Sequence, residues 1–130
     1  MIKPLIFTLM TILSLWGGTI QNDKQFQEAV VSMAKADKLV LMIYTTDGCP
    51  ECAYMKQKVF HDKIVEPYMR RNFVVIEKNV HNDELPDGYD YFGIPTMFFI
   101  DKLGNKKGTI IGSKRSQAFL DEITHIREQK

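Results

Sequence analysis

The sequence has little excess charge and almost no cysteine. Its 17 basic and 16 acidic residues give a formal net charge of +1 without a basic run, so we expect no nucleic-acid partner. Cysteine occurs only at positions 49 and 52, so a zinc site would need two more ligands from His61, His81 and His125. These histidines do not have the paired spacing of zinc ligands. We therefore expect no metal site and interpret the histidines as surface residues.

A long apolar run is also lacking, and the first residues form only a short one. Met1-Ile2-Lys3 gives a positive start, residues 4–16 are uncharged and largely apolar, and Gly17-Gly18-Thr19 follows. This pattern predicts a secretory signal peptide, because about thirteen residues fall short of the roughly 20 that a spanning helix needs. No A-x-A-like cleavage site is present. An uncleaved N-terminal anchor and a buried N-terminal helix therefore stay open as alternatives.

The rest of the chain has the composition of one soluble domain. It is part of a sequence with 45% hydrophobic and 25% charged residues, which suits a globule with a real core. We predict residues 1–19 as a signal peptide or N-terminal anchor and residues 20–130 as a single domain. Export would place the protein in the periplasm, an oxidising compartment. A lone C-x-x-C there is either a structural disulfide or a redox site.

The two cysteines stand in Cys49-Pro50-Glu51-Cys52, between an apolar run that predicts a strand (residues 38–45) and a predicted helix (residues 49–60). A helix N-terminus stabilises a thiolate, so Cys49 is the candidate nucleophile and Cys52 the resolving thiol. Pro50 stiffens the first helical turn. Glu51 adds a negative charge that disfavours the Cys49 thiolate, which favours a reductase over an oxidase. A purely structural disulfide is less favoured, because a bond across two residues closes a very small loop.

The remaining pattern predicts an α/β fold. We expect a mixed central sheet of about four strands with helices on both faces, because strands separated by a helix are usually parallel and hairpin strands antiparallel. Asp62 can cap a helix over residues 63–71 with Ile64 turned inward, and Ser113 or Ser116 can cap the last helix. The other predicted elements are a helix at 24–35, strands at 73–79, 96–101 and 106–111, and a loop at 80–90.

This element order, with Gly93-Ile94-Pro95-Thr96 before the third strand, resembles the thioredoxin fold from about Asp23 to Ile126. It is most similar to exported thioredoxin-like proteins, including sulfur-oxidation-associated thioredoxins and the C-terminal domain of the DsbD reductase. The resemblance implies a cis peptide bond before Pro95, facing the disulfide. It also implies a substrate-docking turn made of Ile94, Pro95 and Thr96, where an extended substrate segment can pair with the backbone.

Two positions depart from the family pattern. Thioredoxins have a Trp directly before the first cysteine, where this chain has Gly48, and a buried Asp six residues before it, where this chain has Ile43. That Asp handles protons for the second thiol. Glu77 lies within the strand at 73–79 and is a candidate substitute, because burial would raise its pKa and suit it as a proton acceptor for Cys52. The alternative is that Glu77 faces solvent or pairs with a neighbouring lysine.

The sequence thus predicts a thiol–disulfide oxidoreductase of the bacterial cell envelope, most simply a reductase of protein disulfides. The resemblance implies disulfide-containing protein substrates, a membrane electron-donor protein that regenerates the dithiol, and no metal or organic cofactor. We expect a monomer, because no dimerisation domain is evident. Two alternatives stay open: disulfide oxidase or isomerase activity, and a redox-inert binding module with the same fold.

Overall fold

The computed structural model describes residues 24–130, so the predicted signal peptide or anchor at 1–19 lies outside the described residues. Four strands form one sheet in the order β2-β1-β3-β4. Strand β1 (Leu39–Thr45) is parallel to β2 (Phe73–Asn79) and antiparallel to β3 (Thr96–Ile100), which pairs antiparallel with β4 (Lys106–Ile111). The mixed α/β sheet and all four predicted strands are confirmed.

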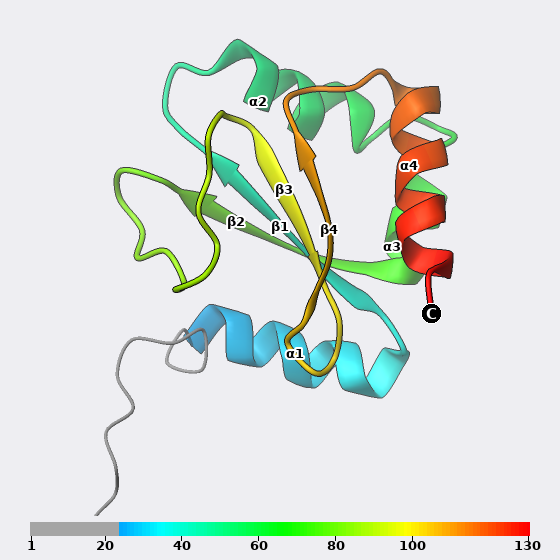
Figure 1. Cartoon of the computed structure of the whole chain (residues 1–130). Helices are drawn as coiled ribbons and strands as arrows, with labels where there is room; N and C mark the ends of the chain where they lie inside the picture. Colours follow the sequence, from blue (N-terminus) through cyan, green and yellow to red (C-terminus); the bar gives the residue numbers. More distant parts are fainter. Residues whose placement is uncertain (1–23) are drawn as a thin grey trace, which may run out of the picture.

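The two central strands are buried along their whole length, which explains why their sequences are continuous apolar runs. Helix α1 (Lys24–Ala36) covers one face of the sheet (Figure 1). The other face carries α2 (Pro50–Tyr54), the π-helix η2 (Met55–Val59), α3 (Glu66–Asn72) and α4 (Ser116–Glu128). Each face has its own apolar core, the first containing Met33, Met42 and Phe98, the second Met55, Phe99 and Phe119.

One predicted helix start is wrong. The helix expected from residue 63 begins at Glu66, because the Asp62 carboxylate accepts a hydrogen bond from the Ile64 N–H at 3.0 Å and holds residues 62–65 in a turn. Val65 is buried by that turn, whereas Ile64, predicted to face inward, is exposed. The same Ile64 N–H, with Ser116, keeps the pKa of Asp62 below its ordinary value.

The last helix lacks the side-chain cap that the sequence suggested. It begins at Ser116 with Arg115 in the N-cap position, and no side chain accepts a hydrogen bond there. The predicted helix at 49–60 is also divided, since its α-helical turn changes into a π-helix at Met55. The wider turn, in which the Phe60 N–H bonds the Met55 carbonyl, places Met55 and Val59 together in the core.

The topology brings three segments to one end of the sheet. Strand β1 ends at Thr45 and leads into the connection that reaches Cys49, while β3 starts directly after Pro95. Because β1 and β3 are antiparallel, Thr96 at the start of β3 pairs with Tyr44 at the end of β1. The cysteine pair and the Ile94–Thr96 turn therefore share the end of the sheet at which parallel α/β sites form. Among residues 24–130, no helix is long and apolar enough to cross a membrane.

Candidate functional site

Cys49 and Cys52 form a disulfide, with their Cα atoms 5.3 Å apart. Cys49 is the N-cap residue of α2, and its sulfur accepts a hydrogen bond from the Cys52 backbone N–H at 3.2 Å. Pro50 occupies the first helical turn, where its missing N–H costs nothing. Gly48 precedes the pair with φ = 70°, a conformation that L side chains rarely adopt, so the Trp of thioredoxins would be strained here.

The two sulfurs differ in their exposure to solvent. Cys49 is half-buried, whereas Cys52 is 2% exposed. When reduced, Cys49 would have both the access and the hydrogen-bond donor that favour a thiolate, since a hydrogen bond to the charged form lowers a pKa. Cys52 can reach Cys49 but not a large substrate. This asymmetry is the arrangement that a nucleophilic and a resolving thiol need.

A polar pocket of about 450 Å³ opens beside the disulfide. Both cysteines line it, and Lys56 from the following helical turn lines it as well. The remaining lining residues are Thr46, Asp47, Gly48, Pro50, Ala53 and Gln57. The pocket gives solvent a way to reach the inner side of the cysteine pair.

The expected docking turn is in place at the start of β3. The Ile94–Pro95 peptide bond is cis, as the family resemblance implies. Thr96 is buried and donates its hydroxyl hydrogen to the Gly93 carbonyl at 2.6 Å, while the Gly112 N–H donates to the Pro95 carbonyl at 2.8 Å. Ile94 is only half-buried. The turn is thus held from two sides, by its own threonine and by the end of β4.

Two exposed apolar side chains flank this turn. Phe92 is 93% exposed, and Ile111 at the end of β4 is also exposed. Gly93 separates Phe92 from the turn and lies beside Ile111. Phe92 and Ile111 thus place two exposed apolar side chains on either side of Gly93, next to the turn.

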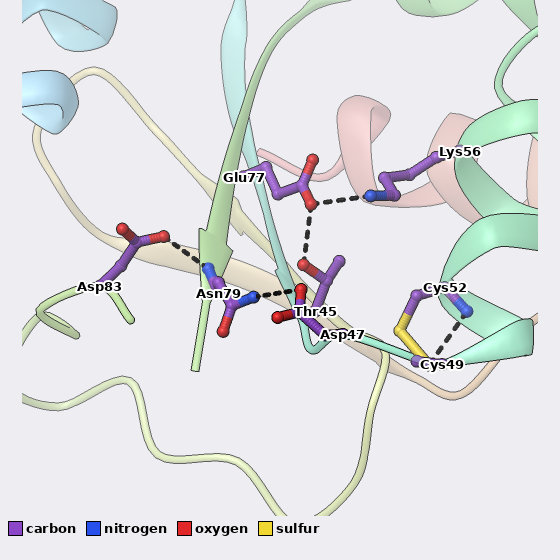
Figure 2. A network of polar contacts seen from close by, with 8 residues as sticks. All are labelled: Thr45, Asp47, Cys49, Cys52, Lys56, Glu77, Asn79 and Asp83. Carbon is purple, nitrogen blue, oxygen red and sulfur yellow. Dashed lines mark hydrogen bonds and ion pairs between the residues drawn. A yellow bond between two sulfur atoms is a disulfide. The ribbon is translucent and has the colours of Figure 1, made fainter. Parts of the chain in front are cut away.

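Glu77 does not have the environment that the sequence analysis expected. Its side chain is 44% exposed and accepts hydrogen bonds from the Thr45 hydroxyl and the Lys56 ammonium, each at 2.8 Å (Figure 2). Partial burial raises the pKa of Glu77, but the two hydrogen bonds and the charge of Lys56 outweigh it, so the pKa lies below its ordinary value. The predicted raised pKa is wrong. The carboxylate pairs with a lysine from the helix, not with a neighbour on its own strand.

Thr45 and Lys56 are the two residues of this cluster that sequence reasoning missed. One signal was available for Lys56, because it follows Cys52 by four residues, and positions i and i+4 share a helix face. The involvement of Thr45 could not be read from spacing, because it depends on the parallel pairing of β1 with β2. That register places Ile43 opposite Glu77 and Thr45 opposite Asn79.

A second set of polar contacts anchors the connection that leads to Cys49. The Asn79 side-chain amide donates to the Asp47 carboxylate at 3.1 Å, and the Asn79 backbone N–H donates to Asp83 at 2.6 Å (Figure 2). Asp47 lies two residues before Cys49. The end of β2 therefore fixes the chain just before Cys49.

Glu51, between the two cysteines, is also held by a hydrogen bond. Its carboxylate accepts a hydrogen bond from the Ser113 hydroxyl in the β4–α4 connection. The carboxylate thus has a defined position within two residues of Cys49, instead of moving freely in solvent. Its effect on the Cys49 thiolate remains a prediction.

Comparison with known proteins agrees with this geometry. The family model of the thioredoxin-like domain matches residues 26–127, so the chain belongs to the thioredoxin-like family. The four-stranded fold and the disulfide-forming C-x-x-C agree with that family assignment.

Individual relatives point the same way. A chloroplastic thioredoxin-like protein of rice (Oryza sativa subsp. japonica) is 33% identical over 109 residues, which cover 81% of this chain but 38% of the rice protein. A thioredoxin from Thermus thermophilus is 27% identical with a TM-score of 0.63, over 77% of this chain and 82% of that one. The oxidised DsbD C-terminal domain of Neisseria meningitidis shares the fold at 21% identity, with a TM-score of 0.63 over 78% of this chain and 91% of that one.

Proposed function

We propose that this protein reduces disulfide bonds in other proteins, in the envelope of a bacterial cell. The observation that carries the proposal is the unequal exposure of the two cysteines, with Cys49 half-buried and Cys52 buried. A structural disulfide would need no such difference. A reductase needs it, because the outer thiol must meet the substrate and the inner thiol must meet only the outer one.

The proposed reaction has two exchange steps. The Cys49 thiolate attacks one sulfur of the substrate disulfide, forms a mixed disulfide and expels the first substrate thiolate. The Cys52 thiolate then attacks the Cys49 sulfur, which forms the Cys49–Cys52 disulfide and expels the second substrate thiolate. Each released thiolate takes up a proton from solvent. The two electrons come from the cysteine pair, and a donor dithiol, proposed to belong to a membrane protein, must return them.

The turn of Ile94, Pro95 and Thr96 is the proposed docking site for the substrate. It starts the strand that pairs with β1, and the half-buried Ile94 offers backbone at its surface. An extended substrate segment can bind there by backbone hydrogen bonds. Phe92 would add apolar contact area beside it.

The location and the domain boundaries are part of the proposal. Residues 1–19 would direct the chain across the inner membrane, either as a cleaved signal peptide or as an anchor, and residues 20–130 would act in the periplasm as a monomer. The short apolar segment after a positive start supports this assignment. The fold shared with a DsbD C-terminal domain is consistent with it, although the rice relative is chloroplastic.

Turnover on a protein disulfide tests the proposal. The full chain, supplied with a small dithiol as electron donor, should reduce a model protein disulfide with multiple turnovers. Cys49→Ser should abolish the activity completely. Lack of turnover by the wild-type protein would instead support a redox-inert binding module, and oxidation of a reduced protein in preference to reduction would support an oxidase.

A further inference from the structure

The side chain of Lys56, the lysine closest to Cys52 along the helix, has a defined position. Lys56 follows Cys52 by one turn, and both residues line the polar pocket beside the disulfide. The Lys56 ammonium lies 2.8 Å from the Glu77 carboxylate, which also receives the Thr45 hydroxyl at 2.8 Å. Figure 2 shows Lys56 extending from the helix toward Glu77 on β2. Glu77 on β2, which is itself bonded to Thr45 on β1, therefore holds this ammonium in place.

The two members of the Lys56–Glu77 ion pair differ in their relation to the pocket. Lys56 lines the pocket together with Cys52, whereas Glu77 is not among the residues that line it. The positive charge of the ion pair therefore belongs to a residue that shares the pocket with the buried cysteine. Where thioredoxins have a buried Asp, this chain has Ile43, which is fully buried and carries no charge.

The other ionisable groups around Cys52 come from three elements. Cys49 and Glu51 are on its own helix, Asp47 is in the connection from β1, and Glu77 is on β2. Glu51 is bonded to Ser113 and Asp47 to Asn79, so both carboxylates are directed to partners outside the cysteine pair. Lys56 is the cation in the lining of the pocket.

We propose that Lys56 is a positioning residue for the second step of disulfide reduction: its ammonium, held by Glu77, stabilises the Cys52 thiolate. This inference rests on the proposed function, because it concerns the step that resolves the mixed disulfide. The Cys52 proton passes to solvent through the pocket. The thiolate then attacks the Cys49 sulfur, the Cys49–substrate bond breaks, and the substrate leaves as a thiolate. Glu77 serves as the counter-ion of Lys56 and takes no proton.

The test is the pKa of the Cys52 thiol, measured from thiolate ultraviolet absorbance in a Cys49→Ser background. Lys56→Met should raise this pKa by about 1, which is roughly a tenfold loss of thiolate near neutral pH. Lys56→Arg should restore it, because the charge is retained. Lys58→Met is the matched control, since Lys58 is on the same helix but does not line the pocket, and should leave the pKa unchanged. An unchanged pKa in Lys56→Met, or no restoration by Arg, overturns the proposal.

Glu77→Gln separates a counter-ion from a proton acceptor. Removal of the carboxylate leaves the charge of Lys56 less neutralised, so the pKa of Cys52 should fall. A rise or no change would contradict the role given to Glu77. Thermal unfolding of each variant confirms that the fold is intact, and a variant that does not fold is replaced by Lys56→Gln.

The failure of this inference and that of the proposed function can be told apart. The Cys52 pKa is measured without substrate and without turnover. If the wild-type protein reduces disulfides but Lys56→Met leaves the pKa of Cys52 unchanged, only the role of Lys56 is wrong. If the pKa responds as expected but the wild-type protein has no turnover, only the reductase assignment is wrong.

Discussion

The Lys56 ammonium lies 2.8 Å from the Glu77 carboxylate. Lys56 follows the buried Cys52 by one helical turn. The pair joins the helix that carries the cysteines to the strand β2, and Thr45 adds a contact from β1. A thioredoxin-like protein without the family's buried Asp thus has an ion pair at the neighbouring strand position. Its carboxylate is ionised, because its pKa is lowered.

Separate cysteine substitutions should have opposite effects on covalent trapping. Cys52→Ser leaves the accessible thiol without its resolving partner, so mixed disulfides with substrate proteins should accumulate at Cys49. Cys49→Ser should form none, because Cys52 is 2% exposed. Non-reducing electrophoresis after incubation with a disulfide-containing protein measures both. Equal trapping by the two variants would contradict the assigned roles.

The stability contributed by Glu77 should depend on pH in one direction. Its pKa is lower in the folded protein than in the unfolded chain, so its stabilising effect is present above the unfolded pKa and is lost as pH falls through the folded pKa. Glu77→Gln should therefore cost up to about 1 kcal/mol at neutral pH, because the pair is nearly half exposed, and close to nothing at strongly acidic pH. Denaturant unfolding of both proteins at the two pH values measures this. A cost that grows on acidification would be the wrong sign.

Phe92 should contribute to the binding of protein substrates but not to folding. The side chain is 93% exposed beside the proposed docking turn, so Phe92→Ser should leave stability almost unchanged. Loss of about 1 kcal/mol of apolar contact would lower kcat/KM on a protein disulfide roughly fivefold. A small-molecule disulfide should be reduced at the wild-type rate.

Leu103→Ser is the matched control for Phe92. Leu103 is 79% exposed in the β3–β4 turn, at the opposite end of β3 from the docking turn. Leu103→Ser should leave kcat/KM unchanged on both the protein disulfide and the small-molecule disulfide. Equal losses in the two variants would mean that exposed apolar residues act nonspecifically.

Gly108 should be intolerant of a side chain. A Cβ atom built there would lie 2.9 Å from Cδ1 and Cγ1 of Ile126, so the Ile126 side chain or the α4 helix that carries it would have to shift. Gly108→Ala should destabilise the fold by about 1–3 kcal/mol, as overpacking of a core contact does. Gly93→Ala is the control for stability, because its Cβ would meet Ile111 at an ordinary 3.6 Å. Urea unfolding compares the two.

The sheet could be predicted from the sequence because its strands carry strong local patterns. Residues 39–45 and 96–100 are buried on both faces, so they are apolar throughout, and their order around the C-x-x-C resembles one known fold. The cysteine asymmetry followed from helix geometry in the same way. Ile64 was misplaced because the Asp62 turn shifts the helix start by three residues.

The Lys56–Glu77 pair could not be predicted, because it depends on the tertiary position of a helix over a strand. Glu77 stands in an apolar stretch of sequence, which indicated burial. In the structure β2 is an edge strand, so one side of it reaches solvent and a lysine from the helix extends to it. The contact joins residues 21 positions apart, and no local pattern specifies such a contact.

The equilibrium reduction potential of the Cys49–Cys52 couple tests the reductase assignment most directly. Alkylation trapping of the wild-type protein across a graded thiol buffer would measure it. Glu51 lies two residues after Cys49, and its negative charge is predicted to disfavour the Cys49 thiolate. We therefore expect a potential near that of thioredoxin, about −270 mV. A potential near that of DsbA, about −120 mV, would make the protein an oxidant and contradict the account.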